Sequence, residues 1–206
     1  MPGKWPDTQF RREIRDFNRE FLELVCTDTR PGSAFGLPPT VRQRLALLAP
    51  AQLEVIAATP CLLAAFVVLP PRQLPLAVAE DPGSGPGLRV NPAIAPRTPE
   101  QAGAQAESAR LFAASLLTWL WHTTRQDRLL AALCIGPGRL GVEQLASAGF
   151  RDLQRAAAGG MDSLEARFCR HPRLWPDLVR AASRADAQVL MATQLSVVQL
   201  TLISRR

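Results

Sequence analysis

The hydrophobic positions near the N-terminus recur at the spacing of a helix. Between Asp7 and Cys26, apolar residues stand three or four positions apart, and charged residues, mostly arginines, fill the positions between them. This period places the apolar side chains on one face and therefore predicts an amphipathic helix. The apolar face consists of Phe10, Ile14, Phe17, Phe21, Leu24 and Val25.

Shorter elements are predicted after this helix. The Pro38–Pro39 pair suits the first turn of a second helix, which we expect to end near Ala49. Pro50 can open a third helix that ends near Thr59. The apolar, partly β-branched run at 61–69 has the pattern of a strand or of a buried helix, and both alternatives stay open.

Proline and glycine are concentrated in residues 70–100. Eight of the chain's 18 prolines lie between Pro70 and Pro99, together with three glycines. This density is incompatible with a long regular element and predicts a linker. The linker separates a first helical domain, residues 1–69, from a second domain, residues 101–206, whose C-terminal part is basic.

Helical periodicity resumes after the linker. A long helix is predicted over 100–125, followed by the apolar run 128–135, helices near 142–158 and 163–170, and a final helix over 177–203. Helix dominates both domains, so the predicted fold class is mostly α. The apolar positions of the long helix are Leu111, Phe112, Leu116, Leu117, Trp119 and Leu120.

The two domains resemble each other. At an offset of 100 residues, 45–58 aligns with 145–158 with five identities, whereas about one is expected by chance in a chain so rich in Leu and Ala. Each copy has a long amphipathic helix, a polar turn, an apolar tripeptide (FGL or LCI) and then two short helices. We therefore predict a tandem duplication of one helical unit.

The chain is basic through arginine. It has 24 Lys plus Arg against 18 Asp plus Glu, Lys4 is its one lysine, and residues 151–206 carry +4 of the net charge of +6. Guanidinium groups can neutralise nucleic-acid phosphates or contact an acidic partner. The alternative is a set of solvated helix faces with internal ion pairs. The candidate contacts are Arg42, Arg44, Arg151, Arg155, Arg167, Arg170 and Arg173.

The sequence contains no specific catalytic or cofactor motif. GPGRLG at 136–141 formally matches a dinucleotide-binding pattern but fits a turn after a helix better than a strand-to-helix loop. His122 and His171 are far apart and have no neighbours at metal-ligand spacing. The four cysteines stand singly, as reduced core residues do. We expect a protein that is not an enzyme and that holds no cofactor and no metal.

Composition and hydropathy bear on the compartment. The N-terminus lacks the apolar run of a secretory signal, which predicts a cytoplasmic location. Prolines or glutamines interrupt the uncharged stretches 55–71 and 187–204, so we expect buried helices there and no membrane span. A content of 47% hydrophobic and 20% charged residues excludes a mostly disordered chain and a multi-span membrane protein.

Four segments of the first domain follow a more specific pattern. DFNREFLEL at 16–24 has the form D-x-N-x-x-aromatic-L-x-L, AFGL at 34–37 precedes the second helix, and LALLAPAQLEVIA at 45–57 and CLLAAF at 61–66 complete the unit. Together these segments resemble FlhD, a subunit of the flagellar master transcriptional regulator. The second domain resembles it more weakly, through LLTWLW, LCI, LASAGFRDLQRAA and ARF.

The resemblance implies a helical unit that dimerises through its first helix and recruits a DNA-binding partner and RNA polymerase. Two copies in one chain imply an internal dimer. The family's cross-linking cysteine falls near Ala64, so no intersubunit disulfide is expected, and the cysteine-based zinc site of the partner FlhC is not in this chain. The candidate interface is Phe10, Ile14, Phe17, Phe21, Leu24, Leu116, Trp119 and Leu120.

Two hypotheses of function follow. The first is a non-enzymatic, FlhD-like transcriptional regulator or co-regulator that contacts an FlhC-like protein partner, possible further copies of itself, and DNA phosphates through its arginines. The alternative is an FlhD-like adaptor or assembly protein of a flagellar, secretion or polysaccharide-export machine that does not bind DNA. Salt-dependent binding to duplex DNA distinguishes the two.

Overall fold

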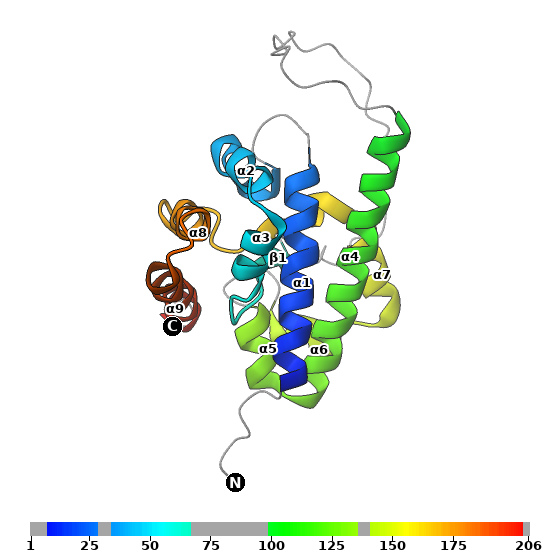
Figure 1. Ribbon diagram of the computed structural model, residues 1–206. Helices are drawn as coiled ribbons and strands as arrows, with labels where there is room; N and C mark the ends of the chain where they lie inside the picture. The colour runs from blue at the N-terminus through cyan, green and yellow to red at the C-terminus, as the bar shows by residue number, and fades with distance from the viewer. Residues whose placement is uncertain (1–7, 29–33, 67–98, 136–140, 204–206) are drawn as a thin grey trace.

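The computed structural model describes residues 8–28, 34–66, 99–135 and 141–203, and helices dominate these ranges (Figure 1). The prediction of a mostly α fold is confirmed. The elements in chain order are α1 (Thr8–Thr27), the 3-10 turn η1 (Ala34–Gly36), α2 (Pro39–Ala46), α3 (Pro50–Ala57), β1 (Ala64–Phe66), α4 (Pro99–Gln126), α5 (Arg128–Ile135), α6 (Val142–Ser147), α7 (Phe150–Ala158), the 3-10 turn η2 (Gly160–Ser163), β2 (Leu164–Ala166), α8 (Leu174–Ser183) and α9 (Ala187–Ile203).

Helices α1 and α4 form the centre of the fold and run antiparallel. Phe10 near the start of α1 stacks on Trp119 near the end of α4, and Phe21 further along α1 stacks on Phe112 nearer the start of α4. Figure 1 shows the two helices side by side along the long axis of the molecule. Phe21 and Phe112 are fully buried, so the apolar faces predicted for both long helices meet each other.

Three further pairs of helices pack around this central pair. Helices α2 and α3 pack against α1, while α6 and α7 pack against α4. Helices α8 and α9 pack on each other, and α8 lies against α2 and α3 at the left of Figure 1. Helix α8, which follows the predicted linker in sequence, therefore covers two helices that precede the linker.

A short two-stranded sheet connects the part of the chain before the predicted linker with the part after it. Strands β1 and β2 pair antiparallel, and Ala65 lies opposite Glu165. The run at 61–69 therefore contains a strand, which decides between the two alternatives left open by its sequence. The helix predicted over 163–170 is wrong: Leu164 and Ala166 are buried and Glu165 between them is partly exposed, an alternation typical of a strand.

The final helix predicted over 177–203 is also wrong, because two helices occupy this part of the chain. α8 begins at Leu174, before the predicted start, and ends at Ser183. Ala185 then adopts a left-handed backbone conformation with a φ of 51°. The Asp186 carboxylate accepts a 3.1 Å hydrogen bond from the backbone N–H of Val189 and so caps the start of α9.

The predicted linker falls almost entirely outside the described residues. Of residues 70–100, the structure describes Pro99 and Glu100, which form the start of α4. The GPGRLG segment likewise lies outside the described residues apart from Gly141, which precedes α6.

Gly36 in η1 lets the segment after β2 approach closely. Its φ is 73°, a conformation that side chains with a Cβ rarely adopt, and a Cβ built there would lie 2.7 Å from Cys169 Sγ. The backbone conformation and the closeness of Cys169 therefore both require glycine at this position of the AFGL segment. In the described part of the chain, no helix combines the length and hydropathy needed to cross a bilayer.

Candidate functional site

The predicted interface residues meet one another inside the chain. Ile14, Phe21 and Leu24 of α1 are buried, as are Leu116 and Leu120 of α4. The remaining three, Phe10, Phe17 and Trp119, are partly buried and form an aromatic group with ring centroids 5.2 Å apart for Phe10 and Trp119 and 5.4 Å apart for Phe17 and Trp119.

A hydrogen bond that the sequence pattern did not predict closes the edge of this contact. The indole N–H of Trp119 donates to the Glu13 carboxylate over 2.7 Å. Glu13 occupies one of the polar positions of α1, so periodicity alone assigned it to solvent. The sequence did contain a hint: a half-buried Trp such as Trp119 usually needs a hydrogen-bond acceptor for its indole N–H, and Glu13 could supply one.

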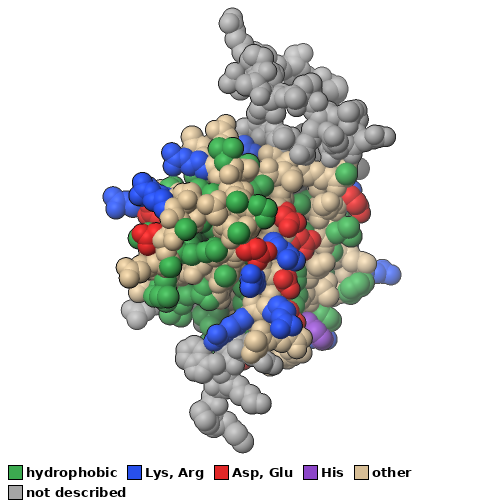
Figure 2. Space-filling view, viewed as in Figure 1, with side chains coloured by type: hydrophobic (Ala, Val, Ile, Leu, Met, Phe, Trp, Pro, Cys, Tyr) green, Lys and Arg blue, Asp and Glu red, His purple; other side chains and the backbone are tan. Residues whose placement is uncertain are grey.

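The candidate arginines do not gather on one surface. Arg44 lies on α2, Arg151 and Arg155 lie on α7, and Arg170 and Arg173 precede α8; all five are exposed. Figure 1 shows α2 and α7 on opposite sides of the central helix pair. On the face seen in Figure 2, basic side chains stand at separate places and alternate with acidic ones.

Arg42 and Arg155 have partners within the chain. The Arg42 guanidinium donates to the backbone carbonyl of Asp28 over 3.3 Å, and Arg42 is half-buried. Arg155 donates to the Asp152 carboxylate over 3.4 Å on the same helix. These contacts match the alternative reading of solvated faces with internal partners, although exposed pairs of this kind contribute little stability.

Arg167 is not the surface residue that its sequence position predicted. Its exposed fraction is 3%, and its guanidinium donates to the backbone carbonyls of Leu133 and Cys134 at 2.9 and 3.0 Å and to the Thr201 hydroxyl at 3.1 Å. Its own backbone carbonyl accepts a bond from the Trp175 indole. Arg167 therefore ties β2 to α5 and α9 and cannot reach a surface ligand in this conformation.

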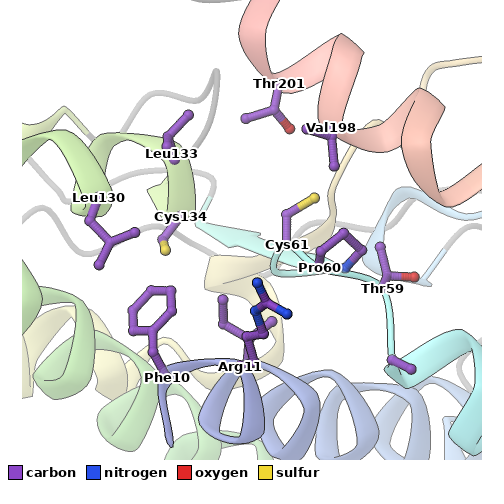
Figure 3. A pocket seen from close by; sticks show the side chains of 12 residues that line it. Phe10, Arg11, Thr59, Pro60, Cys61, Leu130, Leu133, Cys134, Val198 and Thr201 are labelled. Atoms are coloured by element: carbon purple, nitrogen blue, oxygen red, sulfur yellow. The ribbon is translucent and has the colours of Figure 1, made fainter. Parts of the chain in front are cut away.

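A cavity of about 430 Å³ lies between α1, α5 and α9 and the turn that precedes β1 (Figure 3). Its walls are mostly apolar, and one charged residue, Arg11, is among them. The lining residues are Phe10, Arg11, Ile14, Ala58, Thr59, Pro60, Cys61, Leu130, Leu133, Cys134, Val198 and Thr201.

Two buried thiols face this cavity. Burial raises the pKa of the Cys134 thiol to about 12, and burial also raises the pKa of the Cys61 thiol, in both cases against a lowering by the nearby Arg167 charge. Both thiols are therefore protonated at neutral pH, when they are poor nucleophiles and poor metal ligands. Among the described residues, no three His, Cys, Asp or Glu side chains come together in an arrangement suited to a metal ion.

No protein-family model, curated protein or solved structure matches this chain.

Proposed function

We propose that the chain is a tandem duplication whose two helical units form an internal dimer. The register of the sheet carries this proposal. Ala65 lies opposite Glu165, which is 100 positions later, and this is the offset that aligns 45–58 with 145–158 in sequence. When two equal units are related by a two-fold axis, an antiparallel strand pair on that axis places a residue opposite its own copy.

The central helices support the same axis. Phe17 of α1 contacts both Phe112 and Trp119 of α4. It therefore lies beside the part of α4 that includes Leu117, the residue 100 positions later in sequence. In the helix pair and in the strand pair alike, residues about 100 positions apart in sequence therefore lie opposite each other. The packing agrees, because α2 and α3 lie on α1 as α6 and α7 lie on α4.

Cleavage between the units tests the internal dimer. A protease site inserted within residues 70–98 of the full chain would separate the units covalently. We expect the two fragments to elute together from a gel-filtration column after cleavage, since the buried α1–α4 contact and the β1–β2 pair hold them. Fragments that elute separately under native conditions would contradict the proposal.

For the biochemical role, we propose an FlhD-like transcriptional regulator or co-regulator subunit that has no catalytic activity and acts through protein contacts. The face that the family would use to dimerise is occupied within the chain, so a partner would bind elsewhere. Helix α9 supports this, because it is uncharged throughout and exposes Met191, Leu195, Leu202 and Ile203. Figure 2 shows hydrophobic side chains gathered in the region where α8 and α9 lie.

A co-purification experiment tests this role. The full chain and an FlhC-like protein from the same source would be expressed together, with Leu195→Asp as the variant and Leu129→Asp, an exposed leucine of α5, as the matched control. We expect a complex with the wild type and the control but not with Leu195→Asp. Absence of any complex would contradict the FlhC-like partner.

The adaptor without DNA binding is the second candidate, and the arginines favour it. Arg167 is buried, and the exposed candidates lie on separate sides of the molecule. Fluorescence anisotropy with a labelled duplex, with and without the partner, distinguishes the two roles. Binding that weakens steeply with added salt would support the regulator, whereas no binding at low salt in either condition would support the adaptor.

A further inference from the structure

We propose that the cavity between α1, α5 and α9 binds the anionic form of a medium-chain carboxylic acid. Its volume of about 430 Å³ lies in the range of small-molecule sites. The apolar side chains that line it, among them Phe10, Leu130 and Val198, suit a hydrocarbon chain. Such a ligand would connect the two units, since α1 and the turn before β1 supply some of the walls and α5 and α9 supply the others.

A positive charge lies at the opening of this apolar space, on the exposed residue Arg11. Figure 3 shows the Arg11 side chain rising from α1 into the cavity, towards the turn that carries Cys61. Within the described residues Arg11 has no carboxylate partner, whereas Arg15 and Arg19 on the same helix both contact Glu54, at 2.7 and 3.7 Å. A guanidinium presents paired N–H donors that match the two oxygens of a carboxylate.

A second positive charge lies behind the cavity wall. The Arg167 guanidinium donates to backbone or side-chain oxygens of Leu133, Cys134 and Thr201, and all three of these residues line the cavity. Its partners are neutral oxygens, and in the described part of the chain no carboxylate pairs with it. Two guanidinium charges beside a low-dielectric space favour an anion there, because electrostatic interactions are weakly screened in such a space.

The acidic groups nearby do not cancel this charge. Asp127 acts electrostatically on Cys134, but its carboxylate accepts a 2.9 Å hydrogen bond from the backbone N–H of Leu130 and caps α5. Glu13 accepts the Trp119 indole bond on the α4 side of α1. Neither carboxylate lines the cavity. The cavity therefore combines apolar walls with a cation at its opening. These properties match those of an amphiphile with one negative charge.

Isothermal titration calorimetry on the full chain tests the site. The probes are hexanoate, octanoate and decanoate below their micelle-forming concentrations, with decanol as the uncharged analogue. We expect saturable 1:1 binding of decanoate, affinity that rises about tenfold for each two added methylenes, and weaker binding of decanol. Absence of saturable decanoate binding, or equal affinity for decanol, would overturn the proposal.

Three variants locate the site. Arg11→Gln should weaken decanoate binding about tenfold and leave decanol binding unchanged, while Arg12→Gln, an exposed neighbour that does not line the cavity, should have no effect. Ala58→Phe places a bulky ring in the cavity and should abolish binding of both probes; circular dichroism checks that it folds. Equal effects of the two arginine variants, or unchanged binding to a folded Ala58→Phe protein, would show that the ligand binds elsewhere.

Discussion

The Asn18 side chain holds the backbone that leads into β1. Its carbonyl oxygen accepts a 2.7 Å hydrogen bond from the backbone N–H of Leu63, and its amide nitrogen lies 3.0 to 3.1 Å from the carbonyls of Ala57, Thr59 and Cys61. Asn18 is fully buried. One polar side chain of α1 therefore provides hydrogen-bond partners for the backbone groups of the turn between α3 and β1, which no helix or strand can pair.

Replacement of Asn18 should be costly for this reason. Asn18→Ala leaves buried backbone groups of the turn without partners, and we expect the free energy of unfolding to fall by about 2–4 kcal/mol. Chemical denaturation followed by circular dichroism measures the change. Asp16→Ala, on the exposed side of the same helix, is the control and should change stability far less. A loss for Asn18→Ala no larger than that of the control would refute this role of the Asn18 side chain.

Phe21 connects the two units, so its replacement should destabilise both. The ring is fully buried and contacts Phe35 at 5.4 Å and Phe112 at 6.1 Å between centroids. Phe21→Asp buries a carboxylate without a partner and should lower the free energy of unfolding by several kcal/mol, on the order of 4. The melting curve measures this, with the exposed Phe150→Asp as control. An unchanged curve would count against α1 as the central interface.

The helices and their apolar faces could be predicted from the sequence because they depend on local periodicity. The faces of α1 and α4 have regular three- and four-residue spacing, and the structure buries them against each other. The segments that resemble FlhD include the polar residues Asp16, Asn18 and Gln52, but their spacing could not reveal that Asn18 holds a turn 45 positions away in sequence. That contact exists only once α1 and the β1 segment pack together.

Arg167 and the cavity show why the sequence did not predict the site. Arg167 belongs to the segment 163–170, which also contains Glu165 and Arg170, and an arginine in such a segment normally lies on the surface. Its burial follows from strand pairing, in which its backbone N–H donates to the Leu63 carbonyl over 2.7 Å, and from carbonyls that α5 supplies. The cavity is built from four segments separated by up to 191 positions, from Phe10 to Thr201, so no local pattern encodes it.

A disulfide between the strands should form if the register is correct. The bond from the Arg167 N–H to the Leu63 carbonyl makes Ala64 and Ala166 a non-hydrogen-bonded pair, in which Cα atoms are about 4.5 Å apart. Ala64→Cys with Ala166→Cys should therefore oxidise to an intramolecular disulfide. The cross-linked chain migrates faster on a non-reducing denaturing gel. Ala64→Cys alone is the control.

The cross-linking variants would be made in a protein whose four native cysteines are replaced by alanine, so that thiol–disulfide exchange with them cannot occur. The disulfide should also raise the midpoint of chemical unfolding, because it constrains the unfolded chain. A double variant that stays reduced under conditions in which a single exposed cysteine oxidises would contradict the antiparallel register of β1 and β2, and with it the pairing of positions 100 residues apart.

The buried thiols should make stability fall at alkaline pH. Burial raises the pKa of Cys134 to about 12 from an ordinary value of 9.0, so between these values the unfolded chain loses a proton that the folded chain keeps. Stability is then fully present below pH 9 and decreases as the pH rises towards 12, by at most about 1.4 kcal/mol per pH unit for this thiol. Cys134→Ala should reduce the slope of the unfolding free energy against pH between pH 9 and 10.5, measured by urea titration.

Cys26, whose pKa burial raises to about 11, should retain its own contribution in that variant. If Cys134→Ala and wild type lose stability at the same rate over this interval, Cys134 is ionised in the folded chain and the packing of α5 against the cavity is looser than described.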